Sequence, residues 1–366
     1  MDIRVYDFDF KLLCIMSDAI SSSWTIRYNG IGTYEGHFRL SDKVAQIILK
    51  EPYIVITEGE KQAVCTAKVA ESELLVCGRT VNWLLSKRVI PPFKSRTVFG
   101  DTFKGAKEIA EYVLQRTFTA PPKIDEGGCY LENTVDDNRK VGNFTLPSVE
   151  GDTTLDRYFW RNSANTADEV IADLCELAGL GHRLYFNVVD KTWDFEFLEG
   201  EEKPIILSEH NRNLYDASYT EDIEKLASGG WYEIYSSTAS GTDSDGSGAD
   251  EDETVWRYLK KESDLTGMKY WEAKFSESGL SQAQSAMEKR IKECTLQGTV
   301  SGLKYLKDYN LGDTVSAYMR FGNFEKKVKY KIVGINIWYN SDSSGEEPIL
   351  KQVPPNSSVS PVTQET

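Results

Sequence analysis

The sequence lacks several features that would assign it quickly to a class of protein. It contains no run of about 18 or more apolar residues, so we expect no membrane-spanning helix. Its first residues, MDIRVYD, carry no basic stretch followed by an apolar one, which predicts no secretory signal and synthesis in the cytosol. The formal net charge of −15 opposes tight binding to a phosphate backbone, because such binding needs clustered Lys and Arg.

The motifs of the common catalytic classes are also missing. No P-loop, no H-E-x-x-H and no G-x-S-x-G occurs, and the three histidines lie in separate segments. The six cysteines are scattered without C-x-x-C spacing, which favours reduced, buried thiols over a metal or redox site. The sequence therefore predicts no catalytic residue, no cofactor and no metal centre, and its function has to come from its architecture.

One acidic run imitates a calcium loop. Residues 236–253 are rich in Gly, Ser and Asp and almost free of apolar residues, so they cannot bury a core and are predicted to form a mobile loop. The weak candidates for calcium ligands are Asp243, Asp245, Ser247 and Asp250. Thr254 stands where an EF-hand needs a bidentate Glu, and the flanking residues read as strands, so a solvated surface loop is the better interpretation.

The first 90 residues read as a series of short strands. Apolar and polar residues alternate over residues 24–28 and 33–40, and Asn29-Gly30 between them is typical of a tight hairpin. Three further strands are predicted at residues 53–57, 63–69 and 73–77. Strands this short and closely spaced predict a small barrel or sandwich.

The middle of the chain changes character after the prolines at 91 and 92. Apolar residues at helical spacing predict a helix over residues 103–116. A capping box that starts at Thr166 predicts a second helix, which Gly179 ends. Residues 183–189 and 192–198 predict a hairpin, so this part of the chain is interpreted as an α+β insertion.

The last third returns to strands. Strands are predicted at residues 214–220, 231–235 and 254–259, the last two forming a long hairpin around the acidic run. Residues 280–294 predict a third helix, with Ala283, Met287, Ile291 and Cys294 on its apolar side. A closing β-rich segment follows at residues 298–339.

Several of these β-segments resemble one known family. The segments at residues 3–7 (IRVYD), 24–29 (WTIRYN) and 78–90, and near the other end 298–300, 305–315 and 329–337, are similar to the tail-hub (baseplate hub) proteins of long-tailed bacteriophages. They are also similar to the N-terminal hub region of phage tail-associated lysins. The resemblance covers residues 1 to about 339, and each motif is a few residues of β-structure without chemistry.

This resemblance implies a mainly β, α+β fold with two small β-barrels, one of them discontinuous. The boundaries that we predict are an N-terminal barrel at 1–98, an α+β domain at 99–200 with a helical segment 262–295 packed on it, a second barrel made of 201–261 and 296–345, and a flexible tail at 346–366. The tail leaves no room for a peptidase or glycosidase domain, so we expect no enzyme.

The resemblance also implies a structural role in the virion tail tip or baseplate. Three copies are expected to form a ring that joins a sixfold tail tube or distal tail protein to a threefold spike, fibre or tail lysin protein, and DNA is expected to pass through its lumen without specific binding. Synthesis is expected in the cytoplasm of the bacterial host. The predicted ring contacts are Trp24, Tyr28, Tyr34, Phe38, Val315, Tyr318, Ile335 and Trp338.

Two alternatives from other classes stay open. A cell-wall hydrolase would have its site between residues 103 and 200, and would be favoured if His182 lay beside Cys175 or if two acids faced each other across a cleft. A module that binds host-surface carbohydrate would use Trp160, Trp193 or Trp231.

Overall fold

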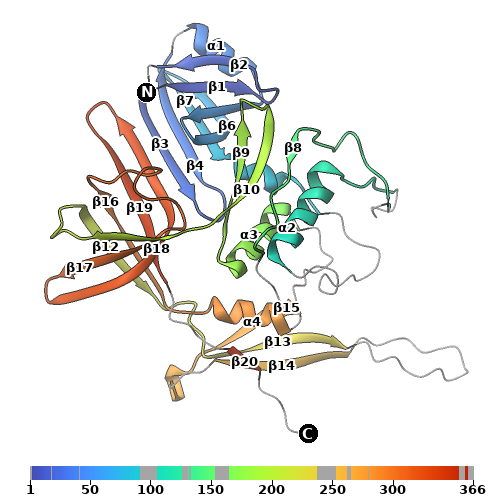
Figure 1. Ribbon diagram of the computed structural model, residues 1–366, viewed down its shortest axis with the longest axis vertical. Helices are drawn as coiled ribbons and strands as arrows, with labels where there is room; N and C mark the ends of the chain where they lie inside the picture. The colour runs from blue at the N-terminus through green and yellow to red at the C-terminus, as the bar shows by residue number, and fades with distance from the viewer. Residues whose placement is uncertain are drawn as a thin grey trace, which may run out of the picture.

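The computed structural model describes residues 2–17, 19–40, 42–90, 105–125, 131, 133–152, 165–236, 253–261, 265–278, 280–353 and 359–361. It is mainly β with a helical part in the middle, which confirms the predicted fold class (Figure 1). One sheet of 13 strands runs through most of the molecule, and two smaller sheets of three and four strands accompany it.

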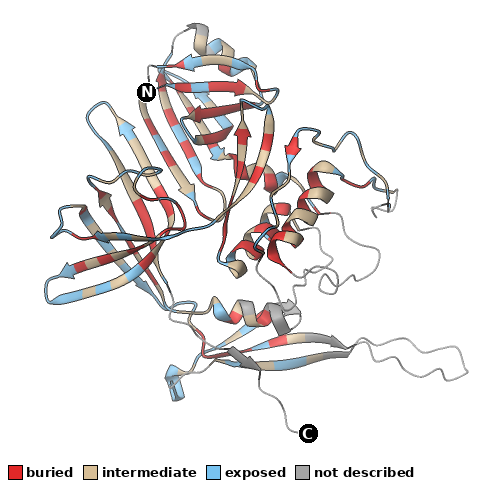
Figure 2. Cartoon of the chain, in the orientation of Figure 1, coloured by how far each residue is buried: buried red, intermediate tan, exposed pale blue. Residues whose placement is uncertain are grey.

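The N-terminal end of the large sheet is built from consecutive segments. Its elements are β1 (Ile3–Asp7), β2 (Leu12–Met16), β3 (Ala19–Arg27), β4 (Thr33–Arg39), α1 (Asp42–Lys50), β5 (Ile54–Glu58), β6 (Lys61–Ala70) and β7 (Glu73–Thr80), followed by the short helix η1 (Val81–Lys87). The predicted hairpin at Asn29-Gly30 is confirmed: β3 pairs with β4, and Gly30 has φ +116°. Figure 2 shows buried positions alternating with more exposed ones along β4 and in the middle of β3.

Both faces of β5 are buried, which explains why its sequence IVITE does not alternate. Ile54 and Ile56 belong to a core with Trp24 and Tyr34, within the N-terminal unit. Val55 lies on the other face, in a core shared with the helices of the middle unit. A strand covered on both sides reads as a continuous apolar run. The middle unit is thereby packed directly against the N-terminal sheet.

The middle unit contains α2 (Ala106–Leu114), the π-helical turn η2 (Gln115–Thr119), β8 (Phe144–Thr145), α3 (Ala167–Ala178), β9 (Gly181–Asn187) and β10 (Thr192–Leu198). The capping box predicted at Thr166 is confirmed, because its side chain accepts from the amide of Glu169 and the Glu169 carboxylate accepts from the amide of Thr166. The predicted hairpin is confirmed as β9 and β10. Gly179 ends α3 with φ +70°.

The other end of the large sheet comes from distant parts of the sequence. It contains β11 (Glu202–Leu207), β12 (Leu214–Asp222), β16 (Glu293–Val300), β17 (Thr314–Phe321), β18 (Phe324–Asn340) and β19 (Ser344–Gln352). Its path is β12-β16-β19-β18, with β17 beside β18 and β11 beside β17. Strand β18 then pairs with β3, from Gly334 opposite Arg27 to Asn340 opposite Ser21. This pairing makes the two halves one continuous sheet.

A separate small sheet has the order β15-β13-β14-β20, with bounds Glu272–Ser278, Gly229–Ser236, Glu253–Lys261 and Val359–Pro361. The predicted long hairpin is confirmed, since Ser236 pairs with Glu253 at the end of β13 and β14. Helix α4 (Leu280–Glu288) covers one face of this sheet, and the short helix η3 (Gly267–Lys269) precedes β15. The acidic run 237–252, with all four candidate calcium ligands, lies outside the described residues.

The structure corrects four of the predictions. The third helix ends at Glu288, and Cys294 lies in β16, because β16 is paired on both sides by β12 and β19. The apolar side of α4 packs on the small sheet instead of on the α+β unit, and Lys289, directly after α4, forms ion pairs with Asp173 and Glu176 of α3.

The predicted flexible tail at 346–366 was also wrong in its first part. Residues 346–352 lie in β19, where Leu350 is fully buried between β16 and β18. Strands β13 and β14, assigned to the second barrel, form the separate sheet described above. The other predicted boundaries, and the closure of each half into a barrel, stay predictions.

Candidate functional site

The residues named for a hydrolase do meet in space, but as part of a core. His182 on β9 is fully buried, and its Nε2 lies 4.0 Å from Oδ1 of Asp168 in the first turn of α3. The imidazole stacks on the ring of Phe195, with centroids 5.9 Å apart. Cys175 on α3 is 1% exposed, and its thiol points to the carbonyl oxygen of Gly181 at 3.9 Å.

The protonation states of these three groups oppose catalysis. Burial lowers the pKa of His182 to about 4 and raises the pKa of the Cys175 thiol to about 12. Burial and the nearby Glu169 carboxylate raise the pKa of Asp168 to about 6. A nucleophilic cysteine needs a lowered pKa and access to substrate, and neither condition is met. The described residues also contain no cluster of His, Cys, Asp or Glu that could hold a metal ion.

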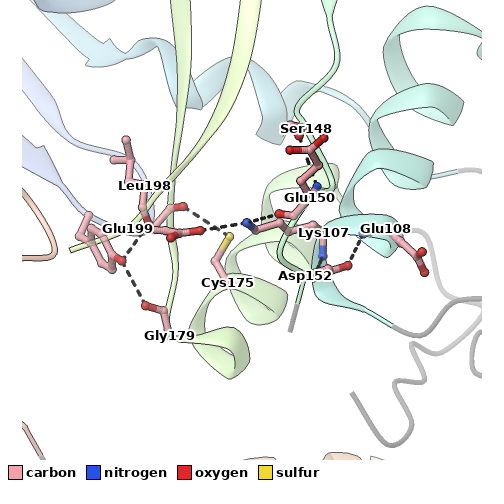
Figure 3. Close-up of polar contacts among 11 residues, drawn as sticks. Lys107, Glu108, Ser148, Glu150, Asp152, Cys175, Gly179, Leu198 and Glu199 are labelled. Atoms are coloured by element: carbon pink, nitrogen blue, oxygen red, sulfur yellow. Dashed lines mark hydrogen bonds and ion pairs between the residues drawn. The ribbon is translucent and has the colours of Figure 1, made fainter. Parts of the chain in front are cut away.

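A polar site lies where the N-terminal half of the large sheet, its second half and the middle unit meet around Tyr28. We call this site the joint. Tyr28 follows β3, and its hydroxyl lies 2.9 Å from the carbonyl oxygen of Leu198 at the end of β10 and 3.1 Å from that of Gly179 at the end of α3 (Figure 3). Its amide donates to the carbonyl of Val333 on β18, and its carbonyl accepts from the amide of His182. One residue thus contacts both halves of the large sheet and the middle unit.

Glycines make room for the tyrosine on both sides. A Cβ on Gly181 would collide with the carbonyl oxygen and ring of Tyr28, and a Cβ on Gly312 would collide with the same edge of the ring, at Cδ2 and Cε2. Gly312 also has φ +90°, where glycine is favoured. A Cβ on Gly200 would likewise collide with the backbone of Gly312. Because these positions carry no Cβ, the Tyr28 ring packs directly against the backbone of the middle unit and of the second half of the sheet.

A lysine from the second half of the sheet also contacts Tyr28 and the end of α3. The ammonium of Lys331 on β18 donates to the carbonyl oxygen of Gly179 at 2.8 Å and lies 4.4 Å from the centroid of the Tyr28 ring. Burial lowers the pKa of Lys331 and raises the pKa of Tyr28 to about 12. The αL end of α3 thus receives hydrogen bonds from both Tyr28 and Lys331, which satisfies a carbonyl that the helix leaves free.

A second polar network holds α2 in the middle unit. The Asp152 carboxylate accepts hydrogen bonds from the amides of Lys107 and Glu108, at 2.8 and 2.9 Å, and so caps the first turn of the helix (Figure 3). The Lys107 ammonium, itself buried, donates to the Glu150 carbonyl at 3.0 Å and to Glu199 at 2.9 Å. Glu199 directly follows β10, so this network ends at the joint.

The structure places most of the predicted ring contacts inside the subunit. Six of the eight are at most 4% exposed and belong to its own cores, which excludes their side chains from contact with a neighbour. These are Trp24, Tyr28, Tyr34, Phe38, Val315 and Ile335. Tyr318 and Trp338 are half-buried and keep some accessible surface. The alternation of the strands found the buried faces, but the chain itself covers them.

Accessible apolar residues instead mark the edges of the large sheet. At one edge, β2 exposes Leu12 by 45% and Ile15 by 50%. At a second edge, β12 exposes Tyr215 by 43%, and Ile223 just beyond it by 45%. A free edge carrying apolar side chains is a ready site for pairing with another chain. No pattern in the sequence marks these strands as edges, because exposure at an edge depends on the strand order.

The candidate sugar-binding tryptophans differ in their surroundings. Trp160 lies outside the described residues. Trp193 is 7% exposed and packs on Phe10 and Phe186 in the core between the N-terminal sheet and the middle unit. Trp231 on β13 is 46% exposed. Within the described part of the chain, no helix is both long and apolar enough to cross a membrane.

The fold is shared with solved tail proteins. The 43 kDa tail protein of prophage MuSo2 from Shewanella oneidensis matches with a TM-score of 0.55 and 12% identity, over 96% of this chain and 98% of that one. A tail protein from Neisseria meningitidis MC58 matches with a TM-score of 0.52 and 11% identity, over 96% of both chains. Prophage tail protein gp18 from Listeria monocytogenes EGD-e matches with 0.52 and 11%, over 96% and 94%.

Comparison with curated proteins finds no match. A family model does match, over residues 2–345, and its description is Siphovirus ReqiPepy6 Gp37-like protein. The match spans almost the entire described structure, including both halves of the large sheet and the joint at Tyr28. The chain therefore belongs to the Siphovirus ReqiPepy6 Gp37-like family of phage tail proteins.

Proposed function

We propose that this tail protein is a hub: three copies form a ring that joins a sixfold tail tube to a threefold spike or fibre-bearing protein. The observation that carries the proposal is the continuous sheet, which β18 and β3 form by pairing the two halves of one chain. In this proposal each of the two sheet halves contributes one segment to the ring, so three subunits supply six. Such a ring matches a sixfold partner on one side and a threefold one on the other.

The joint at Tyr28 supports this role mechanically. A ring closes only if every subunit holds the same angle between its two halves. The contacts of Tyr28 with Gly179, Leu198 and Gly312 restrict that angle, because close-packed groups without intervening side chains leave little room for hinge motion. In this proposal, the contacts around Tyr28 hold the two halves of the sheet at a fixed angle.

The free edges of the large sheet supply the ring contacts in this proposal. Edge strand β2 of one subunit is proposed to lie against the far end of the sheet, near β12, in the next subunit. This contact is heterologous, and a heterologous contact closes into a ring when its rotation fits. Exposed Leu12 and Ile15 would be covered by the neighbour.

The remaining parts of the proposal concern partners and place. The ring is proposed to sit at the tail tip or baseplate, after synthesis in the host cytoplasm, between a tail tube or distal tail protein and a spike, fibre or tail lysin protein. The net charge of −15 suits a channel through which DNA passes without binding. The role is proposed as non-enzymatic, since the His182, Asp168 and Cys175 cluster is buried and in unreactive protonation states.

Charged substitutions on the edge test the ring contact. We expect Ile15→Lys to abolish the trimer measured by light scattering, because a lysine on an edge strand opposes pairing with another chain. The matched control is Val189→Lys in the turn between β9 and β10, where the side chain is 89% exposed and belongs to neither edge strand. Loss of the trimer in both variants, or in neither, would contradict the proposed contact.

A further inference from the structure

The small sheet carries an aromatic face that no other part of the described chain covers. Trp231 on β13 lies directly opposite Tyr258 on β14, and Glu233 lies opposite Trp256, so all four side chains share one face. Trp231 is 46% exposed and Trp256 is 40% exposed. Two tryptophans this exposed on neighbouring strands form an unusual surface, because large aromatic side chains are normally buried.

The other face of the sheet forms its core. Tyr232, Leu259 and Phe275 are at most 4% exposed there, and Ala283 and Met287 of α4 cover them. Figure 1 shows α4 on the side of the sheet that faces the rest of the chain. The aromatic face therefore points away from the large sheet and from the proposed ring edges β2 and β12.

Charged and hydroxyl groups lie between the aromatic rings. Lys274 on β15 is opposite Trp231, and its ammonium lies 4.8 Å from the centroid of the Trp256 ring. Glu272 on the same strand is opposite Gly229. The Tyr258 and Tyr270 hydroxyls lie 3.0 Å apart, in a space that a Cβ on Gly229 would fill. Acceptors, donors and π-faces thus alternate over a few residues of one face of the sheet.

We propose that this face, defined by Trp231, Glu233, Trp256, Tyr258, Glu272 and Lys274, binds a glycan. The C–H groups on one side of a pyranose ring carry positive partial charge and stack on the negative face of an aromatic ring. The hydroxyls of the sugar both donate and accept, so they pair with the Glu carboxylates and with the Lys ammonium. A polymer of sugars presents both kinds of group at short, regular intervals.

A protein partner fits this face less well. The centre of a protein–protein interface is depleted of Glu and Lys, because burying a charge without a partner costs free energy. Here Glu233, Glu272 and Lys274 stand among the rings, so a second copy of the chain or an apolar partner would have to bury three charged groups. A hydroxyl-rich ligand satisfies these groups while its ring faces cover the tryptophans.

The test uses the full chain on an array of bacterial glycans, printed with capsular polysaccharides, lipopolysaccharide cores, teichoic acids and peptidoglycan fragments. We expect saturable binding to at least one class, and we expect Trp231→Ala to weaken it about tenfold. Glu233→Gln should weaken it about threefold, because the amide keeps the shape but loses the charge-assisted hydrogen bond. Light scattering of each variant reports whether its oligomeric state is unchanged.

Trp271→Ala is the matched control. Trp271 is 39% exposed, close to the value for Trp256, but it lies in the turn before β15, where its indole donates to the carbonyl oxygen of Met268. The proposal predicts that this variant binds as the wild type does. Binding to no glycan on the array, or equal losses in Trp231→Ala and Trp271→Ala, would overturn it. If Trp231→Ala no longer forms the trimer but still binds the glycan, the face is a subunit contact. That result would also overturn the proposal.

Discussion

Substituting Gly312 by alanine tests whether the joint at Tyr28 holds the two halves of the sheet together. The new Cβ would collide with the Tyr28 ring, and the backbone would keep an unfavourable φ of +90°. A positive φ costs a residue with a Cβ about 1–2 kcal/mol. Overpacking against a fixed ring adds about 1–3 kcal/mol, so we expect a total of about 2–5 kcal/mol.

Gly302→Ala separates these two costs. Gly302 has φ +76°, but nothing lies within 4 Å of the position that its Cβ would occupy. We therefore expect Gly302→Ala to cost only the backbone share of about 1–2 kcal/mol. The difference between the two variants measures the contact with Tyr28.

The assay is native-state hydrogen exchange, since the four cores of this protein can open separately and a single unfolding midpoint would mix them. The informative amides are those of Tyr28, His182 and Ile332, which donate across or beside the joint to Val333, Tyr28 and Asp313. Gly312→Ala should speed exchange at all three, and Tyr28→Ala should remove most of that additional effect. Equal effects of Gly312→Ala and Gly302→Ala on these amides would refute the reasoning.

Three further predictions concern the middle unit. Asp152→Ala removes the cap of α2 and should lower its local stability by about 1–2 kcal/mol in hydrogen exchange, whereas Asp152→Asn should retain part of it. Cys175 should not react with a thiol reagent at pH 8 in the folded protein but should react in urea, because burial raises its pKa to about 12. Fast labelling of the folded protein at this position would contradict its burial. The pKa of His182 falls from 6.5 to about 4 on folding, so the unfolded chain binds more protons between these values and acid should destabilise the protein there. The pKa of Asp168 rises from 3.8 to about 6 on folding, so between these values the folded chain binds more protons and acid stabilises it. This effect opposes that of His182 in nearly the same pH range. Asp168→Asn removes it, so urea unfolding between pH 6.5 and 4 should show a variant that is more sensitive to acid than the wild type.

Local signals in the sequence predicted the local elements well. Asn29-Gly30 fixed the β3–β4 hairpin, and the Thr166 capping box fixed the start of α3, because each signal acts within a few residues. Gly179, with its positive φ, marked the end of α3 for the same reason. Each of these signals acts through contacts within a few residues, so a short window of the sequence contains it.

Some elements that depend on pairing between distant strands were not predicted correctly. The segment SGEEPILKQ reads as a loop because of its Gly and Pro, but β16 and β18 hold it as the strand β19. Cys294 fits a helical stripe as well as a strand, and its place in β16 is decided by β12 and β19 on either side. Strand neighbours come from residues far away in the sequence, so short windows cannot show them.

The contacts of the candidate site also depend on segments that are distant in the sequence. Alternation placed Trp24 and Tyr34 on the apolar faces of their strands, but it could not tell burial by the chain itself from burial by a neighbouring subunit. The glycines that receive the Tyr28 ring, Gly181 and Gly312, carry no signal in the sequence, because a close approach between distant segments has no local pattern. The free edges of the large sheet likewise follow from the strand order alone.

The measurement that tests the hub proposal most directly is the symmetry of the assembled protein, by two-dimensional averaging of electron micrographs of the purified chain with its mass from light scattering. The proposal predicts particles of three times the 41.3 kDa chain mass that form a threefold ring. The central opening should be roughly 20 Å or wider, enough for duplex DNA, whose major groove alone is about 12 Å across. A monomer at every concentration, or a closed dimer without a central opening, would contradict it.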